Sequence, residues 1–181
     1  MSCAGQKILI RRAKPTDLLQ IMAIERASFP TPWSEQGMRR ELENQNGSIY
    51  LVVEQEGKIL GYVGAWTYAA EAHILTIAVH EDVRRKGLGE LLMLAILREA
   101  AARGCVQAIL EYRCSNAAAG ALYSKLGFRP YAIRRGYYAD THEDAVCAVL
   151  TALNSPQRRR ELDEALARWM KNHDWDVEFE R

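Results

Sequence analysis

The stretch Arg84-Arg85-Lys86-Gly87-Leu88-Gly89-Glu90 decides how this sequence folds and what it binds. It follows an almost continuous apolar run, residues 73–79, and precedes a segment whose leucines recur at helical spacing. Two glycines let a backbone approach a ligand closely, and the free amides and dipole at a helix N-terminus favour phosphate. The stretch therefore predicts a phosphate-binding loop between a strand and a helix, with a solvated basic loop as the alternative.

Two better-known phosphate loops fit this stretch poorly. A Walker loop needs Lys and then Ser or Thr around its last glycine, but Glu90 follows Gly89. A dinucleotide-binding loop needs a third small residue where Leu92 stands, and it follows its strand more closely than Gly87 follows residue 79. The sequence therefore disfavours both nucleotide triphosphate hydrolysis and dinucleotide binding.

Hydrophobic periodicity predicts strands and helices on both sides of this loop. The expected strands are 7–12, 48–54, 58–68, 73–79, 106–112, 130–135 and 143–152, with 73–79 covered on both faces. The expected helices begin at Thr16, Ser34, Leu88 and Ser115, and the third has one buried stripe. Such an order predicts an α/β fold.

Composition limits what the chain binds and where it works. The 181 residues carry a formal net charge of +1, so no bulk attraction to nucleic acid or an acidic membrane is expected. Neither a membrane span nor a secretory signal is recognisable, which favours a cytoplasmic protein. The four cysteines lack zinc-ligand spacing, so reduced thiols and no metal are expected: Cys3, Cys105, Cys114 and Cys147.

The phosphate loop and the residues before it resemble the acetyl-coenzyme A (acetyl-CoA) signature of the GNAT N-acetyltransferases. Residues 111–128 and 135–145 are similar to the RimI branch, the protein N-terminal α-amino acetyltransferases that include the ribosomal protein S18 enzyme. The resemblance covers about residues 7–152. It implies the GNAT fold, a mixed, mostly antiparallel, splayed sheet flanked by helices.

The same resemblance implies a set of residues that bind acetyl-CoA. The backbone of residues 77–79 would pair with the pantetheine arm, the loop amides would hold the pyrophosphate, and Asn116 would contact the cofactor near its reactive end. No metal is implied. The implied cofactor-binding residues are Ile77, Ala78, Val79, Arg84, Arg85, Lys86, Gly87, Leu88, Gly89, Glu90 and Asn116.

By the same resemblance, Glu111 is the general base and Tyr123 the general acid. Acetyl transfer needs an unprotonated amine, and a carboxylate, directly or through water, can accept the amine's proton. A phenol can protonate the departing thiolate of coenzyme A. Without the resemblance, Glu111 is equally well a strand-end acid paired with Arg113 or Lys125, and Tyr123 a core aromatic.

Other reactive side chains receive lesser roles. Cys114 is the obvious nucleophile for a ping-pong route, but no histidine stands near it and the RimI pattern does not use this position for attack. His80 and His142 are candidates for a proton relay, although surface or structural roles are favoured. Direct attack in a ternary complex is therefore expected.

Aromatic residues in two loops resemble the walls that grip a peptide N-terminus in this branch. A packing role between two helices is the alternative for Phe29 and Trp33. The expected partner is a flexible protein N-terminus, with ribosomal protein S18 as the family's usual substrate, and no nucleic acid or membrane is expected. The implied substrate-binding residues are Glu25, Phe29, Pro30, Trp33, Tyr137 and Tyr138.

The chain divides into an acetyltransferase domain, residues 1–154, and a C-terminal helical extension, residues 155–181. Ser155 and Pro156 predict the start of a helix, and residues 174–181 are expected to fray. This helix packs on the domain, mediates self-association or sits loosely. Three alternative functions remain: a small-molecule (polyamine or aminoglycoside) acetyltransferase, a non-catalytic acyl-CoA-binding regulator, and a scaffold acting through the extension.

Overall fold

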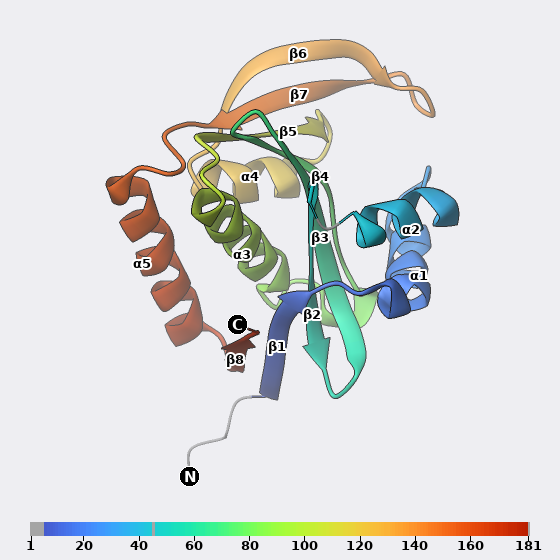
Figure 1. Ribbon diagram of the computed structural model, residues 1–181. Coiled ribbons are helices and arrows are strands. Elements are labelled where there is room, and N and C mark those ends of the chain that lie inside the picture. Colours follow the sequence, from blue (N-terminus) through green and yellow to red (C-terminus); the bar gives the residue numbers. More distant parts are fainter. Residues whose placement is uncertain (1–5, 45, 181) are drawn as a thin grey trace.

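One eight-stranded sheet organises the chain (Figure 1), in a computed structural model that describes residues 6–44 and 46–180. The strands lie in the order β6-β7-β5-β4-β3-β2-β1-β8. Their bounds are β1 Gln6–Arg12, β2 Ser48–Gln55, β3 Lys58–Tyr68, β4 Glu71–Val79, β5 Gln107–Arg113, β6 Arg129–Tyr138, β7 Glu143–Leu150 and β8 Trp175–Phe179.

Five α-helices and two short 3-10 helices connect these strands. The helices α1 and α2 lie on one face of the sheet, and α3, α4 and α5 lie on the other (Figure 1). Their bounds are η1 Pro15–Asp17, α1 Leu18–Ser28, α2 Glu35–Glu43, η2 Glu81–Val83, α3 Leu88–Ala102, α4 Ala117–Lys125 and α5 Pro156–Asn172.

The sheet is mixed and mostly antiparallel, as the resemblance implies. Among the described residues, only the β4–β5 and β1–β8 pairs are parallel. The β4–β5 ladder stops at the pair Ile74–Leu110, although β4 runs on to Val79 and β5 to Arg113. The two strands therefore diverge at their carboxyl ends, which is the splay that the resemblance implies.

The expectation that β4 is covered on both faces is confirmed, although the cover is incomplete: α3 packs on one face and α1 on the other. Buried and half-buried side chains alternate along it, and the half-buried set includes His73, Ile77 and Val79. The buried Ile74 lies in the core cluster around α3 and the buried Ala78 in the cluster on the opposite face, so the apolar run contributes to both. A register shift against β3, between Gly64 and Ala65, also interrupts the regular ladder.

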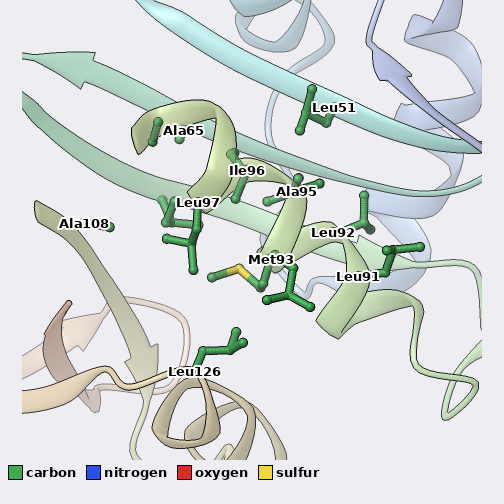
Figure 2. Packing of buried hydrophobic residues seen from close by; sticks show 14 of the residues in the cluster. Leu51, Ala65, Leu91, Leu92, Met93, Ala95, Ile96, Leu97, Ala108 and Leu126 are labelled. Carbon is green, nitrogen blue, oxygen red and sulfur yellow. The ribbon is translucent and has the colours of Figure 1, made fainter. Parts of the chain in front are cut away.

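The larger core cluster surrounds α3, between the sheet on one side and α4 and α5 on the other. Figure 2 shows the side chains of α3 packed among Leu51, Ala65 and Ala108 of the strands and Leu126 at the end of α4. Every residue from Leu91 to Leu97 is buried, so the expected single stripe is wrong. The additional cover comes from α5, which contributes to the same cluster.

A second core cluster lies on the opposite face, where α1 and α2 pack against β2 and β3. Its fully buried members include Ile21, Met38 and Tyr62. The expected helix start at Thr16 is wrong, because Thr16 lies inside η1 and the carboxylate of Asp17 accepts the Lys14 amide at 2.7 Å. Ser34 does cap α2, accepting from the Gly37 amide.

Of the two other helix caps predicted from the sequence, one is confirmed and one is wrong. Ser155 caps α5, since its hydroxyl accepts from the Arg158 amide at 3.1 Å. Asn116, rather than Ser115, caps α4. The Ser115 amide is instead held by the carboxylate of Glu143, at 2.6 Å. The first helical residue is therefore one position later than the sequence suggests.

The C-terminal extension is an integral part of this fold. Its apolar stripe of Leu162, Leu166 and Trp169 is buried in the main core cluster. The expected fraying after residue 173 is wrong for the described residues, because β8 pairs in parallel with β1 from Gln6–Trp175 to Ile10–Phe179. Within residues 6–44 and 46–180, no helix is long and apolar enough to cross a membrane.

Candidate functional site

The predicted phosphate loop has the geometry that an anion needs. Gly87 adopts φ +82° and Arg85 φ +60°, and α3 begins directly afterwards at Leu88. A methyl group at Gly89 would meet only Leu122, at 4.0 Å, so the first turn of α3 is open at this position. Free amides at an open helix N-terminus fit a pyrophosphate group.

The basic residues of this loop differ in their availability. The Arg84 guanidinium donates to the carbonyl of Val79 at 3.1 Å and to the hydroxyl of Ser28 at 3.2 Å. It therefore ties the loop to the end of β4 and of α1. The side chains of Arg85 and Lys86 are exposed. Backbone amides, with these two cations nearby, are the groups best placed for phosphate.

The remaining predicted cofactor residues lie in the end of β4 beyond its pairing with β5 and at the starts of α3 and α4. Residues 77–79 lie beyond the last β4–β5 pair, so the β5 side of this segment has no strand beside it. Asn116 starts α4, and its side-chain oxygen accepts the Ala119 amide at 3.1 Å. Glu90 in the first turn of α3 pairs with Lys125 of α4 at 2.7 Å. These features suit an extended acyl carrier threaded between β4 and β5.

Glu111 lies in β5 one residue past the last pair with β4, and its side chain is only 7% exposed. Its carboxylate lies 2.6 Å from His73 Nε2 and 3.4 Å from Arg134 Nη1. The hydrogen bond from His73, together with the charges of His73 and Arg134, lowers the pKa of Glu111 despite its burial. Glu111 is thus held as a carboxylate where the strands diverge.

The pairing of Glu111 with Arg113 or Lys125 considered from the sequence is wrong. Arg113 binds Asp140, at 2.7 Å, and Lys125 binds Glu90. Residues i and i+2 share one face of a strand, so Arg113 does lie on the face of Glu111. Its side chain, however, reaches a loop carboxylate instead.

Sequence reasoning missed His73 and Arg134 as the partners of Glu111. His73 pairs with Ile109 across the parallel β4–β5 ladder, which places it diagonally to Glu111. The signal was available only once the register of the two strands was known. Arg134 comes from β6, which is separated from β5 by β7.

Tyr123 lies on α4 inside an aromatic group. Its ring centroid is 5.4 Å from that of Tyr112 and 6.0 Å from that of Phe128. Burial, reinforced by the neighbouring tyrosines Tyr138 and Tyr112, raises the pKa of Tyr123 to about 12. The phenol therefore keeps its proton throughout the neutral range. The burial of Tyr123 in the core is therefore compatible with its predicted role as the general acid.

The two predicted substrate walls meet at Asp140. The carboxylate accepts from the Thr31 hydroxyl, in the α1–α2 loop, at 3.4 Å and from Arg113 of β5 at 2.7 Å. The Arg113 guanidinium lies 4.0 Å from the ring centroid of Tyr138, whose own ring is 5.2 Å from that of Tyr137. One network thus joins the α1–α2 loop to the tyrosine wall at the end of β6.

Glu25 is buried, 1% exposed, and its position is fixed by two other elements. One carboxylate oxygen accepts the Trp33 amide at 2.9 Å, and the other accepts the hydroxyl of Tyr62. Tyr62 also lies 3.1 Å from the Thr76 hydroxyl on β4. Glu25 therefore anchors the α1–α2 loop to the strand that carries the cofactor segment. Its role as a substrate-binding residue, which the resemblance implies, stays a prediction.

The aromatic residues of the α1–α2 loop are partly buried and partly available. Phe29 and Trp33 pack against the second core cluster while remaining half-exposed, and Pro30 is exposed. The helix-packing alternative is therefore present in the structure. It leaves part of both rings free for a ligand.

The other reactive side chains stay outside this arrangement. Cys105 and Cys147 are buried free thiols whose pKa values are raised by burial, and Cys114 is an exposed free thiol, while Cys3 lies outside the described residues. His80 contacts the Asp82 amide in η2, and His142 sits in the β6–β7 loop. The described residues contain no group of three or more potential ligands that could hold a metal ion.

Comparisons with known proteins agree with this architecture. The sequence pattern of the acetyltransferase (GNAT) family matches residues 18–128. A putative ribosomal protein bS18-alanine N-acetyltransferase from Bacillus subtilis is 34% identical over 145 residues, which are 96% of that protein and 80% of this chain. The rest of this chain is unmatched there.

The same likeness extends to a bacterial and an archaeal relative. The ribosomal protein bS18-alanine N-acetyltransferase of Escherichia coli is 37% identical, covering 78% of this chain and 95% of that protein. An N-alpha-acetyltransferase from Sulfurisphaera tokodaii is 32% identical, covering 78% of this chain and 91% of that protein.

A solved structure resembles the fold as well. The crystal structure of the S18-alanine N-acetyltransferase from Escherichia coli superimposes with a TM-score of 0.75 at 35% identity, covering 80% of this chain and 94% of that one. The family pattern spans more than half of this chain, and the relatives are matched over nearly their whole length. This chain belongs to the acetyltransferase (GNAT) family and is an N-acetyltransferase.

Proposed function

We propose that this enzyme transfers the acetyl group of acetyl-CoA to the α-amino group of a protein N-terminus, with a bS18-like protein as substrate. The observation that carries the proposal is the Asp140 network, which joins the α1–α2 loop to Tyr138 across the mouth of the splayed sheet. Two joined walls suit an extended peptide end. The names of the relatives support the same substrate class.

The proposed chemistry assigns one task to each part of the site. The amides at the start of α3 hold the pyrophosphate of acetyl-CoA, which supplies the acetyl thioester. Glu111 accepts a proton from the attacking amine, directly or through water, as the nitrogen–carbon bond forms. Tyr123 donates to the sulfur as the carbon–sulfur bond breaks. The products are the acetylated N-terminus and coenzyme A.

The pH dependence of kcat/KM should report the substrate amine. The pKa of Glu111 is lowered by His73 and Arg134, so Glu111 is already ionised well below pH 6. Tyr123, with a pKa of about 12, keeps its proton past pH 9. We expect kcat/KM to rise with an apparent pKa of about 7.7–8.0, the ordinary range of an α-amino group, and then to stay level to pH 9.

Steady-state rates on an alanine-initiated peptide between pH 5.5 and 9.5 check this profile. Tyr123→Phe should lower kcat/KM on the level part of the profile without changing the apparent pKa of the rise. A falling limb below pH 9 that vanishes in Tyr123→Phe would show that the phenol titrates too early for the proposed role.

Removing the Asp140 network should weaken peptide binding selectively. Asp140→Asn keeps the size of the side chain but takes the charge away from Arg113 and weakens the bond from Thr31. We expect KM for the peptide to rise about 10- to 150-fold, the range for the loss of one charged hydrogen bond, while the KM for acetyl-CoA stays within twofold. Asp163→Asn, on the exposed face of α5, is the matched control.

A competition experiment tests the proposed function against its alternatives. A mixture of an alanine-initiated peptide, spermidine and an aminoglycoside, each at equal concentration, is incubated with enzyme and acetyl-CoA and read by mass spectrometry. Preferential acetylation of the peptide supports the proposal. Preferential acetylation of the polyamine or aminoglycoside overturns it in favour of a small-molecule enzyme. Binding of acetyl-CoA without any turnover would favour a regulator.

A further inference from the structure

The C-terminal extension touches the phosphate loop through two indole groups. The Trp169 Nε1–H donates to the carbonyl of Gly87 at 2.9 Å, and the Trp175 Nε1–H donates to the carbonyl of Lys86 at 3.2 Å. Trp169 is buried, 2% exposed, near the end of α5, and Trp175 begins β8. Two consecutive carbonyls of the loop are thus held from the same side.

These two bonds, together with the bond from the Leu91 amide to the Gly87 carbonyl at 3.1 Å, fix the direction of the loop amides. In a trans peptide the C=O and N–H groups point in opposite directions. Holding the carbonyls of Lys86 and Gly87 against the extension therefore turns the N–H groups of Gly87 and Leu88 away from it. Leu88 opens α3, so these amides belong to the helix terminus where a pyrophosphate is expected.

His173 closes the contact and explains why the loop needs glycine at this point. Its ring stacks on Trp169 with centroids 4.4 Å apart, and its Nδ1 lies 2.8 Å from the Trp169 carbonyl. A methyl group on Gly87 would come within 2.8 Å of Trp169 and closer still to His173. The extension thus packs directly onto the backbone of the loop.

The placement of the extension is itself fixed by the rest of the fold. The helix α5 runs beside α3 and leads into β8, which pairs with β1 at the edge of the sheet (Figure 1). Both ends of the Trp169–Trp175 segment are therefore anchored, one in the core and one in the sheet. An anchored segment can keep a loop with two positive-φ residues, Arg85 and Gly87, in one conformation.

We propose that α5 and β8 are a brace that holds the phosphate loop ready for acetyl-CoA, with Trp169, His173 and Trp175 as its positioning residues. The proposal rests on the proposed use of acetyl-CoA and goes beyond it, because it assigns cofactor affinity to residues outside the part that resembles the family. Pre-ordering the loop removes an ordering cost from cofactor binding.

The test measures cofactor affinity by calorimetry, with no acetyl acceptor present. Trp169→Phe and Trp175→Phe keep an aromatic ring at each position and remove the N–H donor together with the five-membered ring that carries it, as the control below also does. Each should raise the Kd for coenzyme A about 3- to 10-fold, the range for one lost hydrogen bond. Trp66→Phe is the matched control. It removes an indole donor on β3 that binds Glu41 and not the loop, so it should leave the Kd unchanged.

A second probe separates the brace from a general loosening of the protein. 3′-Phosphoadenosine 5′-diphosphate carries the pyrophosphate without the pantetheine arm, so its Kd should rise by the same factor as that of coenzyme A. Parent affinity for coenzyme A in both Trp variants overturns the proposal. So does a loss that appears with coenzyme A but not with the diphosphate. If the unaltered protein binds neither probe, the proposed function fails instead.

Discussion

Replacing Glu111 by glutamine is expected to lower kcat for peptide acetylation by about 10²- to 10⁴-fold, the usual contribution of a positioned general base. The amide keeps the size of the side chain, and its one oxygen can still accept from either His73 or Arg134, which contact different oxygens of the carboxylate at 2.6 and 3.4 Å. It cannot take up the amine's proton. The Kd for coenzyme A, measured separately, should stay within about twofold, because no part of Glu111 is assigned to the cofactor.

Glu71→Gln is the matched control for this substitution. Glu71 starts β4, away from the splay, and its carboxylate accepts from Gln107 of β5. Its replacement should leave kcat unchanged. If Glu111→Gln kept more than half of the parent kcat at saturating peptide, Glu111 would be only a structural partner of His73 and another proton acceptor would be needed.

Replacing Asp17 by alanine is expected to destabilise the fold by about 3 kcal/mol, the low end of the cost of breaking a buried ion pair, because Arg11 keeps its pair with Glu54. Asp17 accepts from both terminal nitrogens of Arg11, at 2.7 and 2.9 Å, and both side chains are below 10% exposed. The pair joins β1 to the start of α1. Asp163→Ala removes an exposed pair with Arg98, 61% exposed at the aspartate, and should cost less than about 1 kcal/mol.

The stability lost in Asp17→Ala, measured by urea unfolding, should also depend on pH in a defined direction. Burial raises the pKa of Asp17, but the hydrogen bonds from Arg11 and the Lys14 amide outweigh it, so the folded-state pKa is lowered. The ion pair therefore contributes its stability above the unfolded pKa of about 3.9 and loses it as the pH falls further. The difference in the free energy of unfolding between parent and variant should become smaller below about pH 4. A constant difference from pH 7 to pH 2.5 would contradict this origin.

Most of the fold was readable from local patterns in the sequence. The β2–β3 hairpin around Gly57 and the helix behind Gly87 follow from turn residues and apolar periodicity, which act over a few positions. Of the two wrong helix caps, Ser115 loses the role to its neighbour Asn116, while Thr16 lies inside η1, where the adjacent Asp17 accepts the Lys14 amide. Local chemistry cannot choose between adjacent polar residues when both suit a cap.

The strand β8 shows what local patterns miss. Trp175-Asp176-Val177-Glu178-Phe179 alternates apolar and acidic residues, as a half-buried strand does. Its partner β1 stands at the other end of the chain, so nothing nearby in the sequence reveals the pairing. The continuous burial of α3 from Leu91 to Leu97 has the same long-range origin in α5.

The residues of the candidate site could be predicted from the sequence better than the contacts among them. The phosphate loop and the placement of Glu111 at the end of β5 follow from motif and element order. The contacts His73–Glu111 and Thr31–Asp140 join residues 38 and 109 positions apart. Such contacts depend on strand register and on loop conformation, which the motifs do not encode.

Tandem mass spectrometry of one doubly reactive peptide tests the central claim most directly. The peptide begins with a free alanine, carries one internal lysine, and is incubated with the full-length enzyme, acetyl-CoA and an equal concentration of spermidine. We predict a single acetyl group on the α-amino nitrogen and an unmodified lysine side chain. Acetyl on the lysine alone, or an unmodified peptide beside rapidly acetylated spermidine, would contradict transfer to a protein N-terminus.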